Sequence, residues 1–267
     1  MQPISVALLI STYNWPGALE LVLQSISMQS RMPDEIVIAD DGSGEATQLL
    51  IADFKQAHNL NIKHIWHQDQ GFRKSRILNK AVHQISSDYI IEIDGDIIID
   101  AHFVEDHLNA ARPNYFVQGS RTMISQEKSV EIMHTRQLNL SILSKGLINR
   151  FNALRIPALS GIFQIKPSNP FHIKGCNIAF WKSDYIRING YDNGFEGWGG
   201  EDYEFAARLL HAGLKRTTLK MAAIAFHIYH LDNSRENTVP NDKIYRKTIA
   251  EKLDYSSNGY EEVREND

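Results

Sequence analysis

Short apolar runs alternate with helical patterns over the first hundred residues of the chain. Each run is apolar at successive positions, which is typical of a strand buried on both faces of a sheet. The runs are residues 4–10, 35–39, 61–66 and 89–93. The intervening segments carry apolar side chains at helical spacing, and they are residues 18–28, 46–58 and 75–85. This alternation predicts an α/β fold in which helices flank a mostly parallel central sheet.

Polar side chains follow three of the predicted strands. Tyr13 comes after the first strand, Asp41 after the second and Asp94 after the fourth. The carboxyl ends of parallel strands meet at one edge of an open α/β sheet, and ligands bind at that edge. The sequence therefore predicts a ligand site bordered by Tyr13, Asp41 and Asp94.

The strand–helix alternation weakens after residue 102, and the elements expected in the second half follow no regular order. The elements expected there are a polar helix over residues 128–151, a connecting or mobile segment over 155–172, an apolar stretch over 175–181, an amphipathic helix over 203–211, a last strand over 221–228 and a helix over 244–253. We expect one folded unit over residues 1–260, followed by a disordered tail over residues 261–267.

Composition narrows the class of protein only slightly. The formal net charge of -4 gives no general attraction to nucleic acid, so we expect no nucleic-acid partner. Cys176 is the only cysteine, which rules out an internal disulfide and favours a reducing compartment. The apolar run at residues 4–10 is too short for a signal peptide or a membrane span. These features predict a cytoplasmic protein.

The acidic sequence Asp94-Gly95-Asp96 directly follows a buried strand. Two carboxylates at positions i and i+2 can meet one hard divalent cation from the same side. An acidic turn without a ligand is the commoner meaning of so short a motif taken alone. The buried strand before it favours the metal-binding interpretation.

Two further segments carry groups that suit a nucleotide. Asp41 can accept hydrogen bonds from a base or a ribose, although an Asx turn before a helix explains it equally well. Arg73, Lys74 and Arg76 lie at the start of a predicted helix, where three cations suit a diphosphate. A solvated basic loop is the more frequent explanation for such charges.

Residues 195–202, with the sequence FEGWGGED, form the most unusual segment. Trp198 offers an apolar face to a sugar ring, and an adjacent carboxylate can act as general base toward a hydroxyl. Acidic residues in the first turn of a helix also stabilise that helix without any ligand. This second explanation accounts for Glu201 and Asp202 but not for the tryptophan and its three neighbouring glycines.

His227 and His230 follow the last predicted strand. Either one alone is more often an ordinary surface or core histidine. As a pair near an acidic site they become candidate metal ligands, because Mn²⁺ accepts imidazole as well as carboxylate. Cys176 has no histidine motif beside it, so we expect a small buried residue.

Together these motifs resemble the GT-A glycosyltransferases. Residues 1–110 are similar to the family 2 kind, and they would form the nucleotide-sugar-binding half. Residues 170–232 would form the acceptor and catalytic half, because residues 175–230 resemble the galactosyltransferase-type C-terminal region. That region is shared by β-1,4-galactosyltransferases, polypeptide GalNAc-transferases and bacterial chondroitin polymerases, and its signature GWGGED is matched at residues 197–202. Residues 103–174 carry no distinctive match.

The resemblance implies a role for each matching residue. The nucleotide-sugar would contact Ser11, Tyr13, Asp41, Arg76, Asp94 and Gly95, with Arg76 near the diphosphate. Asp96 and His230 would bind a divalent metal, with Mn²⁺ favoured over Mg²⁺, and His227 would join them in place of the family's methionine. Trp198 and Glu201 would bind the acceptor, and Asp202 would be the general base.

The resemblance implies a metal-dependent, inverting hexosyltransferase. It would move galactose, N-acetylgalactosamine or a related sugar from a UDP-sugar to a hydroxyl of a glycan or glycolipid acceptor. We expect it to act in surface polysaccharide or lipooligosaccharide synthesis, with possible peripheral association at the inner face of the membrane. The alternatives are a retaining transferase and a nucleotide-sugar- or glycan-binding module without catalysis, which the intact acids disfavour.

Overall fold

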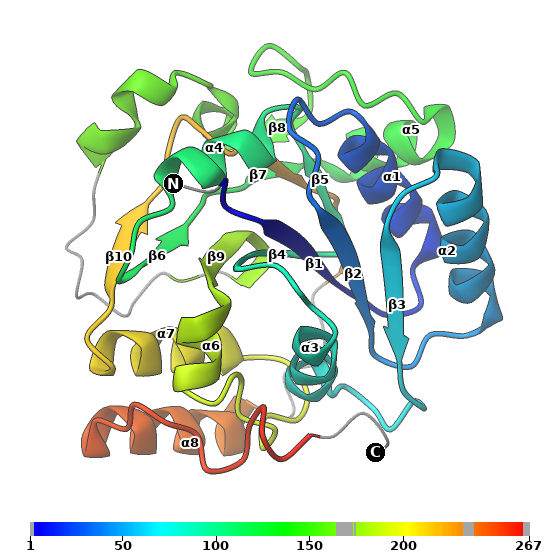
Figure 1. Cartoon of the computed structure of the whole chain (residues 1–267). Helices are drawn as coiled ribbons and strands as arrows, with labels where there is room; N and C mark the ends of the chain where they lie inside the picture. The colour runs from blue at the N-terminus through cyan, green and yellow to red at the C-terminus, as the bar shows by residue number, and fades with distance from the viewer. Residues whose placement is uncertain (1–2, 164–172, 174, 232–237, 264–267) are drawn as a thin grey trace.

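The computed structural model describes residues 3–163, 173, 175–231 and 238–263. A seven-stranded sheet lies at its centre, in the order β10-β6-β9-β4-β1-β2-β3 (Figure 1). Its strands are β1 (Val6–Thr12), β2 (Glu35–Asp40), β3 (Ile62–Trp66), β4 (Tyr89–Asp94), β6 (Tyr115–Gln118), β9 (Ile178–Trp181) and β10 (Lys215–Thr218). Only β9 runs against its neighbours in this sheet. The predicted α/β fold with a mostly parallel sheet is confirmed.

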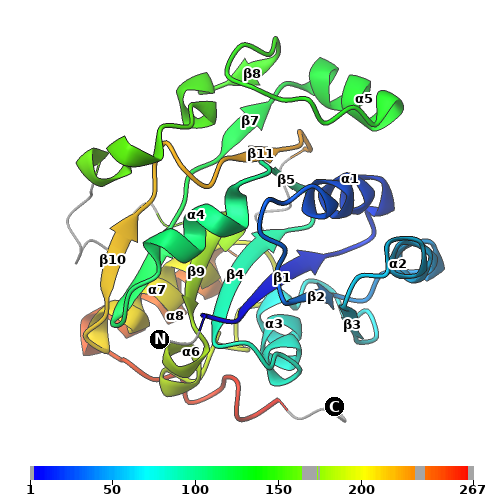
Figure 2. The same cartoon turned by 45° about the horizontal axis from the view of Figure 1, so that its top comes forward.

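A second sheet of four strands lies along one side of the molecule (Figure 2). Its order is β5-β11-β7-β8, with β5 (Ile97–Ile99), β7 (Thr122–Ile124), β8 (Leu147–Ile148) and β11 (Ala225–His227). The antiparallel pairing of β11 with β5 places His227 opposite Ile97. This register brings the end of β11 to the turn between β4 and β5, which contains Asp96.

Helices cover both faces of the central sheet. The described α-helices are α1 (Pro16–Ser27), α2 (Glu45–His58), α3 (Lys74–His83), α4 (Phe103–Ala110), α5 (Gln126–Thr135), α6 (Lys182–Arg187), α7 (Glu201–His211) and α8 (Thr238–Glu251). Side chains of α1, α2 and α4 enter the core on one face, whereas those of α3, α6 and α7 enter the core on the other. Helix α8 packs outside α7, where Thr248 Oγ1 donates a hydrogen bond to Glu204 Oε1 at 2.9 Å.

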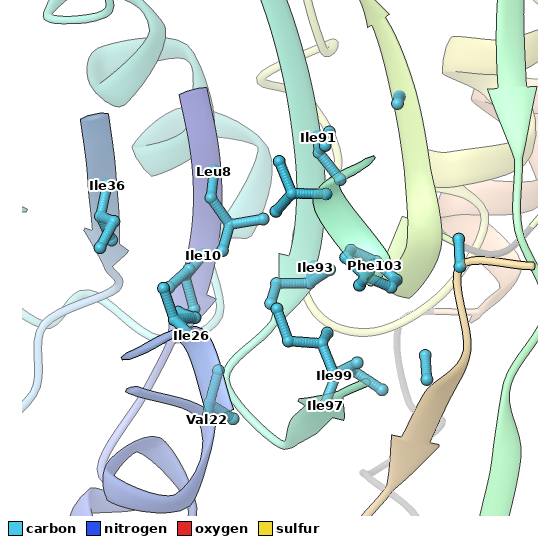
Figure 3. Close-up of a cluster of buried hydrophobic side chains, with 14 of the residues drawn as sticks. Leu8, Ile10, Val22, Ile26, Ile36, Ile91, Ile93, Ile97, Ile99 and Phe103 are labelled. Atoms are coloured by element: carbon cyan, nitrogen blue, oxygen red, sulfur yellow. The ribbon is translucent and has the colours of Figure 1, made fainter. Parts of the chain in front are cut away.

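Strand β1 shows why the sequence forms this layered core. Leu8 and Ile10 enter one cluster, and Ala7 and Leu9 enter the other, because successive side chains of a strand point to opposite faces. Figure 3 shows part of the first cluster, in which side chains of β1 and β4 lie beside Val22 and Ile26 of α1. The continuous apolar sequence of β1 therefore serves both cores at once.

The predicted helix over residues 128–151 is wrong beyond Thr135. Helix α5 ends there, and Arg136 adopts a left-handed φ of 57°. Leu138, Leu140 and Ile142 then pack on the third apolar cluster. Their alternate spacing suits an extended chain and not a helix. A short strand, β8, and a 3₁₀ helix, η1 (Arg150–Ala153), follow.

Other boundaries also differ from the predictions. The last predicted strand over residues 221–228 shrinks to β11, because Met221 and Ala223 adopt left-handed φ values of 57° and 47°. Part of the expected connecting or mobile segment forms a 3₁₀ helix, η2 (Pro157–Phe163), whereas residues 164–172 lie outside the described residues. The helix expected at 244–253 is α8, which begins six residues earlier.

The end of the described chain belongs to the fold. Val263 is fully buried, and Glu262 Oε2 accepts hydrogen bonds from Asn189 Nδ2 and the Gly259 amide. The expected disorder is therefore wrong for residues 261–263, and residues 264–267 lie outside the described part. Among the described helices, none combines the length and the apolar character that crossing a bilayer requires.

Candidate functional site

A cavity of about 980 Å³ opens at the carboxyl ends of β1, β2 and β4. Tyr13, Asp41 and Asp94 all line it, as the order of the strands led us to expect. Every other residue to which the family resemblance assigns a role lines it too, with the exception of Arg76. The structure therefore brings both predicted halves of the site to one cavity.

Asp96, His227 and His230 form a candidate metal centre within this cavity. One ligand atom from each of the three side chains lies within 4.8 Å of the other two. Asp96 Oδ2 is 3.4 Å from His227 Nε2 and 3.2 Å from His230 Nε2. Burial lowers the pKa of His227, which favours the neutral imidazole that a metal needs. The other oxygen of Asp96 is buried without a hydrogen-bond partner among the described residues.

The chemistry of these three side chains fits a transition-metal ion. One carboxylate and two imidazoles suit Mn²⁺, whereas Mg²⁺ prefers oxygen ligands alone. Pairing of β5 with β11 holds the segment that carries Asp96 beside the segment that carries the two histidines. The Ile228 amide also donates a hydrogen bond to the Asp96 carbonyl at 3.0 Å. The arrangement therefore rests on backbone structure and not on the side chains alone.

Asp94 lies beside this cluster and has partners of its own. Ser11 Oγ donates to Asp94 Oδ1 at 2.9 Å, and Lys74 Nζ lies 2.7 Å from the same oxygen. Burial opposes ionisation of Asp94, but Lys74 and Ser11 outweigh it and hold the pKa of Asp94 below its usual value. Gly95 packs so close to β1 that a Cβ would lie 2.9 Å from the Ser11 carbonyl oxygen.

Asp41 and Tyr13 are held in place before any ligand arrives. Asp41 Oδ1 lies 2.7 Å from His67 Nε2, and Asp41 Oδ2 accepts a hydrogen bond from the Arg73 amide at 2.7 Å. A carboxylate oxygen can accept more than one hydrogen bond, so Asp41 retains capacity for a ligand. The Tyr13 hydroxyl donates to Asp69 Oδ2 at 2.9 Å, and its half-exposed ring borders the cavity.

Glu201 and Asp202 lie in the first turn of α7 and line the same cavity. Asp202 Oδ2 accepts a hydrogen bond from the Gly175 amide at 2.8 Å, and Asp202 Oδ1 has no partner among the described residues. Burial raises the pKa of Asp202 above its usual value. Burial, followed by repulsion from Asp202, raises the pKa of Glu201 to about 7. Both groups therefore titrate closer to neutrality than exposed carboxyls do.

The glycines of the GWGGED segment have a backbone role. Gly199 and Gly200 adopt φ values of 111° and 97°, which side-chain-bearing residues rarely adopt. They carry the chain into α7 and leave Trp198 partly exposed at the cavity wall. Tyr203 and Tyr245 line the same side, with their ring centroids 6.3 Å apart. This wall therefore offers several aromatic faces next to Asp202.

Two basic residues line the cavity: Lys74 was one of three cations expected near a diphosphate, and Arg121 was not expected there. Lys74 lines the cavity in place of the predicted Arg76, although both belong to the same basic run. Residues two apart on a helix face different sides, so the run alone does not show which one faces the ligand. Arg121 also lines the cavity and donates to Cys176 Sγ at 3.0 Å. It lies in a stretch without any recognisable motif, so no sequence signal pointed to it.

Cys176 is buried, as we expected. Burial raises the pKa of its thiol to about 12, so it is not a thiolate nucleophile at neutral pH.

Comparison with known proteins gives two family matches. The model described as "Glycosyl transferase family 2" matches residues 7–184, which is more than half of the chain. The model described as "N-terminal domain of galactosyltransferase" matches residues 164–231. The two matches overlap and together cover the strands and loops that line the cavity.

The curated relatives include polysaccharide synthases. Chondroitin synthase of Escherichia coli is 26% identical over 238 residues, which cover 83% of this chain and 34% of that protein. Hyaluronan synthase of Pasteurella multocida is 24% identical over 228 residues, which cover 79% of this chain and 23% of that protein. The chain therefore spans about a third or less of the length of these two relatives.

Solved structures show the same fold at low sequence identity. GalNAc-T7, solved with UDP, GalNAc and Mn²⁺, has a TM-score of 0.68 at 15% identity over 93% of this chain and 48% of its own. A fragment of S. aureus TarS in complex with UDP has a TM-score of 0.62 at 15% identity, over 92% of this chain and 65% of its own. The fold is that of the GT-A glycosyltransferases. The chain belongs to glycosyl transferase family 2 and is a glycosyltransferase.

Proposed function

We propose that this chain transfers a hexose or an N-acetylhexosamine, with galactose or N-acetylgalactosamine favoured, from a UDP-sugar to a hydroxyl of a glycan acceptor. We further propose that the transfer inverts the anomeric carbon. The observation that carries this is the placement of a candidate metal centre and a carboxylate base on one cavity. Solved neighbours of the same fold contain UDP and Mn²⁺, which supports a nucleotide-sugar and a metal here.

Asp96, His227 and His230 would hold the divalent metal, with Mn²⁺ favoured by the two imidazoles. A metal at this place supplies electrostatic stabilisation to the departing diphosphate. Tyr13 and Asp41, at the ends of β1 and β2, would bind the uridine. Lys74, one of the three cations expected from the sequence near a diphosphate, adds a positive charge inside the cavity.

Asp202 would accept the proton of the attacking hydroxyl. The acceptor oxygen forms a bond to the anomeric carbon, the bond from that carbon to the diphosphate oxygen breaks, and UDP leaves. The raised pKa of Asp202 brings its basicity closer to that required near neutral pH. Its unpartnered Oδ1 leaves one oxygen for the acceptor, and the Trp198 face beside it would support the sugar ring.

The segment at residues 194–200 contacts the loop before α3. The Gly197 amide donates to the Phe72 carbonyl at 3.1 Å, and Arg73 pairs with Glu196 at 2.6 Å. These contacts join the acceptor wall to the donor side of the cavity. We propose that this segment shields the bound donor from water during transfer.

A screen of UDP-sugars tests the proposal directly. The true donor should raise the thermal unfolding temperature with Mn²⁺ present and release UDP when an acceptor glycan is added. NMR of the product should show the anomeric configuration opposite to that of the donor. Retention of configuration would replace the inverting mechanism with a retaining one. Stabilisation without UDP release, with any acceptor, would favour the non-catalytic binding module.

A further inference from the structure

One long segment of the chain is basic and contains no acidic residue. Residues 132–183 hold seven of the 28 Lys and Arg residues and none of the 32 Asp and Glu residues. The remainder of the chain is correspondingly acidic, since the whole has a formal net charge of -4. The charge is therefore divided unevenly along the sequence.

The same segment carries an unusual group of exposed apolar side chains. Leu143 is 85% exposed, Phe151 77%, Ile162 71% and Ile148 53%. They are not the remainder of a core, because Leu147 and other members of the segment already fill the third apolar cluster from the inner side. We call Leu143, Ile148 and Phe151, which lie within one short stretch of chain around β8, the outer apolar patch. Such a group on a protein surface marks an interaction site.

Two cations lie between the residues of the outer apolar patch in the sequence. Lys145 and Arg150 are exposed, and neither has an acidic partner in the described part of the chain. In contrast, Arg136 and Arg155, on either side of these two cations in the sequence, pair with Glu20 and Asp106. Charge in the patch is therefore available to a partner of opposite sign.

The patch lies close to the cavity through one pair of strands. β8 carries Ile148 and is the edge strand of the small sheet. Its neighbour β7 pairs Met123 with Ile148 in register, and Met123 lines the cavity. In both views the segment from α5 through β8 to η1 forms one outer side of the molecule (Figures 1 and 2).

We propose that the outer apolar patch, with Lys145 and Arg150, docks the protein on a bilayer that contains anionic phospholipid. The apolar side chains would enter the interface between headgroups and acyl chains. The cations would contact the anionic headgroups. A symmetric dimer through this patch fits less well, because each patch would then face the positive charge of the other. Docking here would hold the cavity near acceptors that are attached to lipid, a consequence that rests on the proposed function.

Vesicle co-sedimentation of the whole chain, without donor or acceptor, tests the docking surface. We expect binding to vesicles of equimolar phosphatidylglycerol and phosphatidylcholine, weaker binding to phosphatidylcholine alone, and weaker binding as salt rises. The double variant Lys145→Glu, Arg150→Glu should lose about tenfold or more in affinity for the anionic vesicles. The double variant Leu143→Ser, Phe151→Ser should lose roughly tenfold on the same vesicles, because two apolar side chains no longer insert.

Helix α2 offers a matched control, since it carries an exposed leucine and an exposed lysine away from the patch. The double variant Leu49→Ser, Lys55→Glu should bind vesicles as the unchanged chain does. Circular dichroism and thermal unfolding of each variant would establish whether it is folded. Equal loss of binding in patch and control variants would overturn the proposal. So would unchanged vesicle binding in the patch variants, or dimerisation that the Phe151 change abolishes while vesicles are ignored.

Vesicle binding and sugar transfer are separate readouts. A protein that binds anionic vesicles but transfers no sugar would leave the docking surface intact and reject the proposed function. A protein that transfers sugar to a soluble acceptor but does not bind vesicles would support the proposed function and reject the docking surface.

Discussion

Lys74 Nζ lies 2.7 Å from Asp94 Oδ1, and this ion pair connects the two acidic clusters of the cavity. Lys74 also interacts electrostatically with Asp202, Glu92 and Glu201. Burial alone would lower the pKa of Lys74, but the four carboxyl groups outweigh it and raise that pKa well above its usual value. One cation therefore influences the protonation of the donor side and of the acceptor side together.

Replacing Lys74 should change the pH dependence of transfer. In Lys74→Met, the pKa of Asp94 and of Asp202 should rise, because Lys74 lowers both in the unchanged chain. The acidic limb of the kcat/KM profile should then move to higher pH by about 1 pH unit or more. Lys74→Arg should largely restore the profile, and Lys55→Met on α2 is the control. An acidic limb that stays in place in Lys74→Met would contradict the linkage.

Asp202→Asn should abolish most of the transfer without unfolding the chain. Loss of a general base costs about 10²- to 10⁴-fold in rate. Binding of UDP with Mn²⁺, measured as a rise in unfolding temperature, should persist because Asp202 is not part of the metal cluster. The exposed Asp254→Asn on the chain's surface should keep full activity. Near-normal transfer by Asp202→Asn would require a different base.

His230→Ala and His227→Ala should each weaken Mn²⁺ binding by at least about tenfold, because each removes one imidazole from the cluster. Electron paramagnetic resonance of free Mn²⁺ measures this directly, without any need for activity. His102→Ala, at a partly exposed histidine outside the cavity, is the matched control. If neither cluster variant changed Mn²⁺ affinity, the metal would have to bind elsewhere.

His107 should make the fold less stable in mild acid. It is completely buried in α4, and burial lowers its pKa from 6.5 to about 4. The unfolded chain therefore binds a proton at a higher pH than the folded chain does. The contribution of neutral His107 to the free energy of unfolding is fully present above pH 6.5. It is lost as the pH drops toward 4. The loss amounts to at most about 3 kcal/mol.

Urea unfolding of the unchanged chain and of His107→Gln, at several pH values, measures this contribution. His107 Nε2 lies 2.9 Å from Asn177 Oδ1, and a glutamine amide is a donor that replaces that hydrogen bond without titrating. The unfolding free energy of the unchanged chain should fall with pH more steeply than that of His107→Gln. Any stability advantage of the unchanged chain at neutral pH should therefore shrink or reverse in acid. A difference independent of pH would mean that His107 is not the titrating group.

The first half of the fold could be predicted closely from the sequence. β1, β2, β3 and β4 lie within about two residues of their predicted ranges, because each is a continuous apolar run between turn residues. The small sheet could not be predicted. Its strands are two or three residues long, and their partners lie far away in the chain. No local pattern encodes such pairings.

The chain sequence by itself determined which chemical groups the site contains. Asp94 and Asp96 follow a strand, and Glu201 and Asp202 follow a glycine-rich turn, so their position at element ends was evident. Only the tertiary structure decided which of them meet. Pairing of β5 with β11 joins Asp96 to His227 and His230, a grouping that the family resemblance implied but that no local sequence pattern encodes. The orientation of α3 selects Lys74 over Arg76, because residues two apart on a helix face different sides.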